Sequence, residues 1–198
     1  MTSTSTPTRN RGNRRTEILD AAARLFAARG FHGVSMEDIG GAVGISGPAL
    51  YRHFSGKDAL LTEMLTDVSS RLRESAVAVA TSSPGARETL DALLNVQITF
   101  AIEQSALITV HDRELGNVPE QERRQIRRLQ RLYVEEWVTA LAELHPGCPA
   151  ARLRAATHAV FGLLNSTPHS AGELPGHDMR PLLHTMARAA IDAAVNDR

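Results

Sequence analysis

The chain of 198 residues is long enough for one or two domains, and its 42% hydrophobic content is sufficient for a substantial core. Aromatic residues make up only 4%, so the core must be aliphatic and rich in alanine, which suits packed helices better than a β-sandwich. Lysine plus arginine equals aspartate plus glutamate at 22 each, which excludes a global field that would by itself indicate nucleic-acid or membrane binding.

The single cysteine, Cys148, excludes an intrachain disulfide framework and a cysteine-rich zinc site. No stretch approaches the roughly 18 apolar residues of a membrane span, and the N-terminus is polar where a signal peptide would be apolar. We therefore expect a soluble cytoplasmic protein with no membrane segment, metal or cofactor. Basic residues exceed acidic ones in residues 1–60, and residues 1–13 are expected to be a disordered basic arm.

The apolar pattern predicts helices in chain order. From Asn13, apolar residues recur with helical spacing until Gly30, which can adopt the left-handed conformation that ends helices. Ser35 offers an N-cap hydroxyl to a short second helix, which Gly44 interrupts, and Ser46 caps a third.

A longer helix follows from a capping box formed by Ser55 and Asp58 to about Val79. Loop signals rich in glycine and proline separate the remaining helical runs. These runs are predicted near residues 86–103, 105–115, 119–144, 150–166 and 179–195. No window alternates with period two, so the fold class is all-α with about nine helices.

Residues 35–54, SMEDIGGAVGISGPALYRHF, fit a helix-turn-helix, in which the second helix enters the DNA major groove. By spacing alone, a simple packing module would fit equally well. The remaining polar side chains favour DNA, because they can donate to phosphate oxygens. They are Ser46, Tyr51, Arg52, His53 and Lys57, together with the arginines of the arm.

The segments ILDAAARLFAARGFHGVSMEDIG, AVGISGPALYRHF and SGKDALL, between Ile18 and Leu61, resemble the DNA-binding domain of the tetracycline-repressor (TetR) family of transcriptional regulators. The resemblance implies a homodimeric regulator, usually a repressor, that leaves its double-stranded operator when a small-molecule effector binds. It also implies a DNA-binding domain over residues 14–60 and a helical ligand-binding and dimerisation domain over residues 61–198.

The resemblance assigns roles in DNA binding. Ser46, Gly47 and Pro48 open the recognition helix and face base edges, whereas Tyr51 and His53 match the family's phosphate-binding residues. The expected DNA-binding set is Arg14, Arg15, Ser35, Ser46, Gly47, Pro48, Tyr51, Arg52, His53 and Lys57. In this set Ser35 caps the second helix, and Lys57 is similar to a lysine that pairs with backbone phosphate.

Structural alternatives accompany these roles. His53 could be an ordinary surface histidine, Tyr51 a half-buried core ring, and the arginines of the arm only solubilising. Gly47 stands where the family often has a longer polar side chain, so sequence specificity leans on the neighbouring residues and on DNA shape. Gly41 lies inside a helix and costs about 1 kcal/mol relative to alanine.

The last two predicted helices carry apolar stripes wide enough for a core and a partner. The expected dimer residues are Leu153, Ala156, Val160, Leu163, Leu164, Leu183, Met186, Ala190 and Ile191. The resemblance points to a four-helix bundle made from two such pairs. Alternatively, both helices only complete the core of the monomer.

An effector pocket is predicted from sparse polar groups on an apolar helix, a pattern that an ordinary core helix also shows. The candidates are Asn95, Gln97, Thr99, His111, Arg113, Trp137 and Asn165. Four arginines, Arg124, Arg127, Arg128 and Arg131, form a basic stripe that is either a solvated face or a site for the phosphates of an acyl-coenzyme A. The second interpretation follows a similarity to TetR-type regulators of lipid metabolism.

An enzyme and a ligand-independent architectural protein are the alternatives to a regulator. No nucleophile elbow, phosphate-binding glycine loop or HExxH motif supports an enzyme. A ligand-independent architectural protein would be basic throughout, whereas residues 61–198 have a net charge of −3. The sequence therefore favours a ligand-responsive transcriptional regulator, most simply a repressor.

Overall fold

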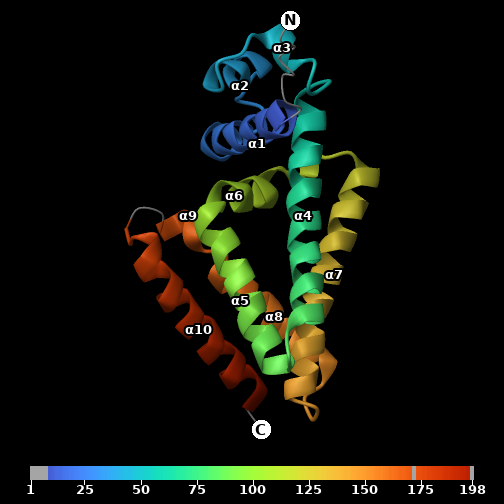
Figure 1. The fold of residues 1–198 in the computed structure, drawn as a ribbon, viewed down its shortest axis with the longest axis vertical. Helices are drawn as coiled ribbons and strands as arrows, with labels where there is room; N and C mark the ends of the chain where they lie inside the picture. The colour runs from blue at the N-terminus through green and yellow to red at the C-terminus, as the bar shows by residue number, and fades with distance from the viewer. Residues whose placement is uncertain (1–8, 171–172, 197–198) are drawn as a thin grey trace, which may run out of the picture.

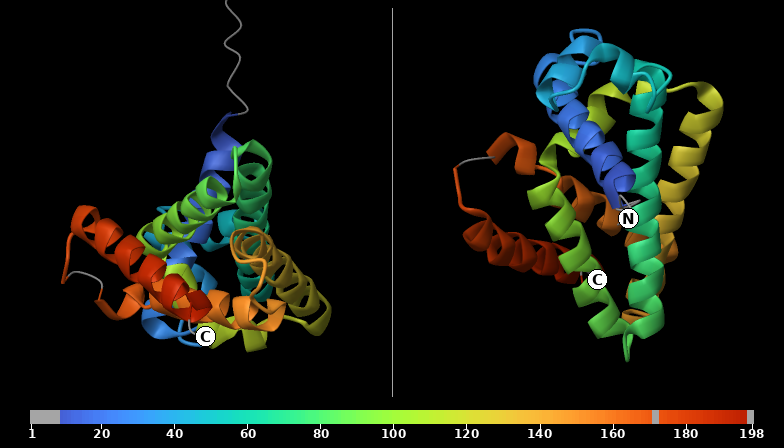
Figure 2. Two further views of the ribbon diagram at one scale, coloured as in Figure 1. Left: turned by 90° about the horizontal axis from the view of Figure 1, so that it is seen from below. Right: turned by 45° about the horizontal axis from the view of Figure 1, so that its top comes forward.

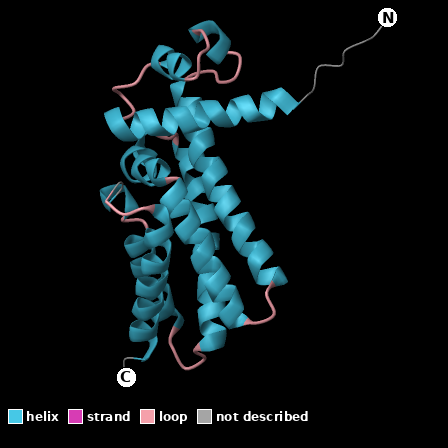
Figure 3. Ribbon diagram, turned by 60° about the vertical axis from the view of Figure 1, so that its left-hand side comes forward, coloured by secondary structure: helices cyan, strands magenta, loops and turns pink. Residues whose placement is uncertain are grey.

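The computed structural model of the chain describes residues 9–170 and 173–196, and this part contains helices and no strand (Figure 3). The helices are α1 (Arg9–Arg29), α2 (Met36–Ala42), α3 (Gly47–Leu50), α4 (Lys57–Ser82), α5 (Ala86–Glu103), α6 (Ser105–Glu114), the 3-10 turn η1 (Leu115–Asn117), α7 (Glu120–Leu144), α8 (Ala150–Leu164), α9 (Thr167–Ser170) and α10 (Gly176–Asn196). The predicted all-α class is confirmed, and each expected helical segment contains an observed helix. Only the short α9 and η1 were not anticipated.

Helices α1, α2 and α3 form a head at one end of α4, and the remaining helices form an elongated body (Figure 1). Helix α4 runs from the head to the far end of the body, packed against α7 and α5. Helix α6 lies under α1, between head and body, and α10 runs along the outer side of the body, packed against α8 and α5 (Figures 1 and 2). Helices α4 and α6 therefore both connect the head to the body.

Head and body share a core. Ile18, Phe26 and Leu50 of the head belong to the same buried cluster as Val110 of α6 and Ile126 of α7. The expected domain boundary at residues 60 and 61 falls inside α4, whose first turns belong to this cluster. Burial of these side chains is the main stabilisation of the joint, because apolar area removed from water contributes about 25 cal/mol per Å².

Two helix starts differ from expectation. Helix α1 begins at Arg9, so residues 9–13, expected in a disordered arm, are helical, and residues 1–8 lie outside the described part. Helix α4 has Gly56 at its N-cap and no side-chain cap, so the predicted capping box of Ser55 and Asp58 is wrong. The Asp58 carboxylate still lies in the first turn, where the helix dipole favours it.

No single helix in the described ranges has the length and apolar composition of a membrane span. Helix α5 has that length and composition only when it is taken together with α6 and η1, and this pair is bent by 84°.

The turn of the head depends on three glycines. Gly30 and Gly44 have φ angles of +73° and +69°, which explains why the chain turns where the sequence predicted it to. Gly40 packs against the turn itself: a Cβ at this position would lie 2.8 Å from the carbonyl oxygen of Ile45. A Cβ at the neighbouring Gly41 would meet nothing within 4 Å.

These two glycines make a matched pair for mutation. Gly40→Ala is expected to destabilise the protein by about 1–3 kcal/mol, because the backbone of the turn must move. Gly41→Ala is expected to stabilise it by about 0.5–1 kcal/mol, through the lower entropy of the unfolded chain. Urea unfolding of both variants measures the difference, and equal free energies of unfolding would contradict the packing argument.

Candidate DNA-binding surface and effector pocket

The start of α2 is fixed by a capping box. The Ser35 hydroxyl accepts a hydrogen bond from the Asp38 amide at 3.0 Å, and the Asp38 carboxylate accepts one from the Ser35 amide at 2.8 Å. The predicted Ser35 cap is thus confirmed. The hydrogen bonds from Ser35, with the nearby Arg29 guanidinium, hold the pKa of Asp38 below its ordinary value.

The capping box makes the head sensitive to acid. Because the folded-state pKa of Asp38 is lowered, its contribution to stability is present above the ordinary carboxyl pKa and is lost as the pH falls through the lowered one. Asp38→Asn is expected to remove this part of the acid dependence. Thermal unfolding of both proteins between neutral pH and pH values near 3 tests it, and parallel curves would contradict it.

Helix α3 lies at the outer end of the head, away from the body (Figure 1). Ser46 is the N-cap residue of α3, but its hydroxyl forms no capping hydrogen bond with the helix. Ser46, Pro48 and Arg52 are exposed, Gly47 and His53 are half-buried, and the Tyr51 side chain is 51% exposed. The ring of Tyr51 is therefore not part of the core, although that was the alternative interpretation. These six residues share one short segment on the surface.

Three other predicted DNA contacts point into the protein. Arg14 donates to the carbonyl of Val43 at 2.7 Å and pairs with Glu17 at 2.7 Å. Arg15 forms an ion pair with Glu63 of α4, and the hydrogen bonds that its guanidinium donates to that carboxylate raise the pKa of the guanidinium. Both arginines therefore tie α1 to its neighbours.

Arg15 has two further contacts in the head. It donates to the carbonyl of His53 at 2.7 Å, and its guanidinium lies 4.2 Å from the centroid of the Phe54 ring. Arg15 of α1 therefore links the turn after α3 to α1 and, through its ion pair with Glu63, to α4.

Lys57 fastens the loop between α1 and α2. Its ammonium donates to the carbonyl of Phe31 at 2.7 Å and to that of Val34 at 2.8 Å. It also lies 4.5 Å from the centroid of the Phe31 ring. Two of its three N–H groups are therefore used inside the protein, which leaves one for a phosphate.

The same loop is held from the body by Glu114, the last residue of α6. Its carboxylate, only 8% exposed, accepts a hydrogen bond from the Phe31 amide at 3.1 Å and another from Asn117 at 2.7 Å. Phe31 is thus bound on one side by α4 and on the other by α6. This role of Glu114 was not predictable, since a carboxylate at a helix end gives no signal of a partner 83 residues away in the sequence.

The body contains a partly open pocket of about 260 Å³, here called the inner chamber. It is lined by Val68, Ser69, Leu72, Gln97, Phe100, Leu107, Ile108, His111, Asp112, Gln130, Tyr133, Val134, His158, Phe161 and Asn165. Its walls come from α4, α5, α6, α7 and α8, and they are mostly apolar. This is the composition of a small-molecule site, with few polar groups on an apolar background.

A chain of hydrogen bonds crosses the wall of the inner chamber. The Tyr133 hydroxyl donates to the Gln97 amide oxygen at 3.0 Å, and the Gln97 amide nitrogen donates to the Asn165 oxygen at 2.8 Å. Burial raises the pKa of Tyr133 well above its ordinary value, so the phenol stays a donor. His111 and Gln130 form a second polar pair at 2.6 Å.

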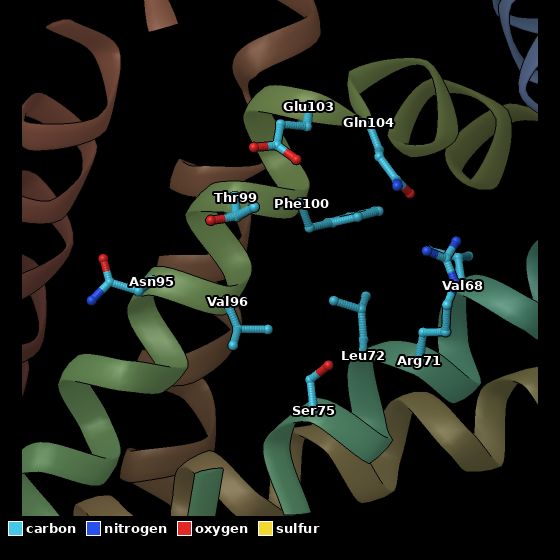
Figure 4. A pocket seen from close by; sticks show the side chains of 10 residues that line it. All are labelled: Val68, Arg71, Leu72, Ser75, Asn95, Val96, Thr99, Phe100, Glu103 and Gln104. Atoms are coloured by element: carbon cyan, nitrogen blue, oxygen red, sulfur yellow. The ribbon is translucent and has the colours of Figure 1, made fainter. Parts of the chain in front are cut away.

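The predicted pocket residues divide into three groups. Gln97, His111 and Asn165 line the inner chamber, as expected for pocket residues. Asn95 and Thr99 line a different pocket, of about 390 Å³, between α4 and α5, here called the outer cleft (Figure 4). Arg113 is exposed and Trp137 is fully buried, and neither lines the inner chamber or the outer cleft.

Trp137 nevertheless lies directly behind the inner chamber. Its ring packs edge-on against Phe161 at 5.0 Å and against Tyr133 at 6.3 Å between centroids. Sequence analysis missed Tyr133, Phe161 and Phe100, since aromatic residues at helical spacing look like ordinary core.

The arginine stripe of α7 lines neither pocket. Its four arginines are exposed, and Arg124 pairs with Glu120 at 2.7 Å. Arg123 and Arg124 together lower the pKa of Glu120 to about 2. The first turns of the stripe are therefore a solvated face with local ion pairs.

Six of the nine expected dimer residues are buried within the single chain, so they form core and cannot form a surface. They are Leu153, Ala156, Val160, Leu164, Leu183 and Ile191. Leu163 and Ala190 are half-buried, and Met186 is 46% exposed. The exposed face beside them consists of Ala155, Ala159 and Gly162 on α8 and Leu182, Met186 and Ala189 on α10. The apolar periodicity of α8 and α10 is present, but the larger side chains of the stripe are buried in the core of the single chain.

Comparison with known proteins identifies both parts of the chain. The family described as bacterial regulatory proteins, tetR family, matches residues 18–64, and the tetracyclin repressor-like C-terminal domain matches residues 83–169. The transcriptional repressor KstR2 of Rhodococcus jostii is 32% identical over 120 residues, which cover 59% of this chain and 57% of that protein. The transcriptional regulator BetI of Rhizobium meliloti is 32% identical over 139 residues, covering 69% and 67%.

The fold also matches solved structures. AibR, in a crystal structure with isovaleryl coenzyme A and operator DNA, superposes with a TM-score of 0.69 at 21% identity, covering 87% of this chain and 97% of that one. At this identity the match concerns the fold. Within the described ranges, no group of three or more His, Cys, Asp or Glu side chains is placed to hold a metal ion.

Proposed function

Because the chain belongs to the TetR family of bacterial regulatory proteins, and is therefore a DNA-binding transcriptional regulator, we propose that it is a ligand-responsive repressor. In this proposal a homodimer binds a pseudo-palindromic operator in the cytoplasm, and a small, largely apolar effector releases it. The observation that carries the proposal is the coexistence of the exposed α3 segment and the inner chamber, joined through α6.

The proposed DNA surface consists of the exposed residues around α3. Ser46 and Pro48 face base edges, and Tyr51, Arg52 and His53 contact phosphates on either side. Gly47 leaves room at the groove: its Cβ would lie 3.6 Å from Glu37, an ordinary contact, so its small size is not required by packing. Arg14, Arg15 and Lys57 act instead by positioning α3, since their charged groups are engaged inside the protein.

A selection of bound fragments from genomic DNA tests the proposal, since a repressor must enrich a few palindromic sites. Arg52→Ala is then expected to lower the slope of log affinity against log salt concentration by about one, because one phosphate contact is lost. Fluorescence anisotropy at several salt concentrations measures this slope. An unchanged slope would remove Arg52 from the phosphate contacts, and the absence of any preferred site would remove the repressor function.

The proposed dimer interface is the exposed face of α8 and α10. Small residues at Ala155, Ala159 and Gly162 allow close approach of helices, and Leu182 and Met186 supply apolar surface beside them. A two-fold dimer places its α3 segments about 34–36 Å apart, one turn of DNA. Sedimentation of Met186→Glu, with Asp192→Lys as a surface control, tests the interface.

The proposed effector is an acyl-coenzyme A or a related lipid metabolite. The apolar walls of the inner chamber and the Tyr133–Gln97–Asn165 chain suit an acyl group with a polar carbonyl. AibR, whose structure holds isovaleryl coenzyme A, shares the fold. Effector binding would change operator affinity through α4 and α6, with a coupling free energy of about 1–3 kcal/mol. Binding of effector without any change in operator affinity would contradict this mechanism.

A further inference from the structure

The inner chamber and the outer cleft share one wall. Val68 and Leu72 of α4 and Phe100 of α5 line both pockets. Figure 4 shows Leu72 projecting from α4 and Phe100 from α5 into the space between the two helices. The partition is therefore made of side chains, of which Phe100 is half-buried, and side chains can change rotamer without movement of a helix.

The volumes favour joint use of the two pockets. Ligand pockets commonly measure about 300–1,000 Å³. The inner chamber, at about 260 Å³, lies just below this range, and the outer cleft adds about 390 Å³. A ligand that extends through the partition would use a site of ordinary size.

The two pockets differ in chemistry. The inner chamber combines apolar walls with the Gln97–Asn165 pair and with one carboxylate, Asp112, whereas the outer cleft has Arg71 and Gln104 at the end nearest α6. Arg71 donates to Asp67 through its Nε at 2.8 Å, and its two Nη groups form no hydrogen bond with any described residue. In Figure 4 these groups point toward Gln104.

The charges around Arg71 permit an anion. Its pair with Asp67 is an exposed pair one helical turn apart, a kind that is weak in water. The acid that lines the cleft is Glu103, which lies 3.9 Å from Arg180 of α10 in a pair that is likewise exposed. On its other side Arg71 lines a second pocket together with Asp20, Glu63 and Asp67. Among the residues that line the outer cleft, Arg71 is the cation, and its Nη groups are the donors available to a ligand there.

We propose that the effector is an amphipathic anion that occupies both pockets. Its apolar end lies in the inner chamber, and its carboxylate or phosphate headgroup lies in the outer cleft on Arg71 and Gln104, past a displaced Phe100. The inference rests on the proposed function, because it takes the inner chamber to be the effector site.

The single tryptophan provides a direct readout. Trp137 packs against Phe161 and Tyr133 of the inner chamber, so an apolar chain that enters the chamber will change its fluorescence. The probes are octanoate, octanoyl-coenzyme A and the neutral octanol. Both anions are expected to bind more tightly than octanol, and comparison of the two anions separates a carboxylate headgroup from a phosphate one.

Arg71→Gln tests the headgroup site. It is expected to weaken binding of at least one of the anions about tenfold and to leave octanol unchanged, because only the charge-assisted bonds are lost. Arg87→Gln, at an exposed arginine in the first turn of α5 that lines neither pocket, is the matched control and is expected to change the binding of neither anion nor of octanol. Equal effects of the two substitutions, or equal weakening of the anions and octanol, would overturn the headgroup site.

Phe100→Ala tests the partition. In stopped-flow mixing it is expected to speed association of octanoate about tenfold, which corresponds to a barrier lowered by about 1.4 kcal/mol, and Phe100→Leu is expected to be intermediate. Thermal unfolding identifies any variant that is not folded. Unchanged association in folded Phe100→Ala, or no change in Trp137 fluorescence with any probe at millimolar concentration, would overturn the inference. Operator binding measured without probe is independent of these results, so its failure would count against the proposed function alone.

Discussion

Glu114→Ala is expected to destabilise the joint between head and body by about 1–3 kcal/mol, because the buried Phe31 amide loses its acceptor. The carbonyl of Phe31 still accepts a hydrogen bond from Lys57. The effect is therefore expected to be a local opening of the loop between α1 and α2. Hydrogen exchange at residues 31–34, together with urea unfolding, measures both effects. Faster exchange confined to this loop is the expected signature.

Two comparisons make this prediction specific. Glu114→Gln keeps an oxygen for the Phe31 amide, and Asn117 can reverse its own amide, so a smaller effect is expected. Glu103→Gln, on the exposed rim of the outer cleft, serves as the control. If Glu114→Ala and Glu103→Gln unfold at the same urea concentration, Glu114 does not hold the loop.

Local signals explain why the helices were predictable. Gly30, Gly44 and the Ser35 cap act within a few residues of themselves, so their effect on the backbone can be deduced from the sequence alone. The error at Ser55 shows the limit of this reasoning. A motif of two residues matched the capping pattern, yet Gly56 took the N-cap position in an extended conformation.

The partners of polar side chains were not predictable, because they come from distant parts of the chain. Arg15 and Lys57 were predicted to contact DNA, but their acceptors within the protein lie in the turn after α3, on α4 and in the loop after α1. A sequence shows which groups can donate hydrogen bonds. It does not show whether a phosphate or a carbonyl receives them.

Apolar periodicity has a similar limit, since core and interface both require it. Leu153 and Val160 are indistinguishable by pattern from side chains that meet a partner, and the structure buries both within one chain. The proposed interface rests instead on the spacing of Ala155, Ala159 and Gly162, because small residues along one exposed face contribute little to a core. For the lining of the inner chamber, some polar residues were predictable, whereas Tyr133 and Phe161 were not, because aromatic residues at helical spacing are also typical of a core.

Lys57→Met is expected to reduce the stability of the head by about 2–3 kcal/mol, because the carbonyls of Phe31 and Val34 lose a charged donor. Methionine retains an apolar stem of similar length, so the change removes the ammonium and little packing. Operator affinity is expected to fall strongly, since the loop before α2 loses its attachment to α4. Urea unfolding and anisotropy with a selected operator measure the two effects.

The salt dependence of this variant decides between two roles of the lysine. If the ammonium binds only the carbonyls of the loop, its removal leaves the slope of log affinity against log salt concentration unchanged. If it contacts a phosphate, its removal lowers that slope by about one. The geometry of two internal hydrogen bonds favours the unchanged slope, with Arg52→Ala as the variant whose slope falls. A lowered slope with full stability would return Lys57 to the phosphate contacts that the sequence resemblance implies, and positioning of α3 would then rest on Arg14, Arg15 and Glu114.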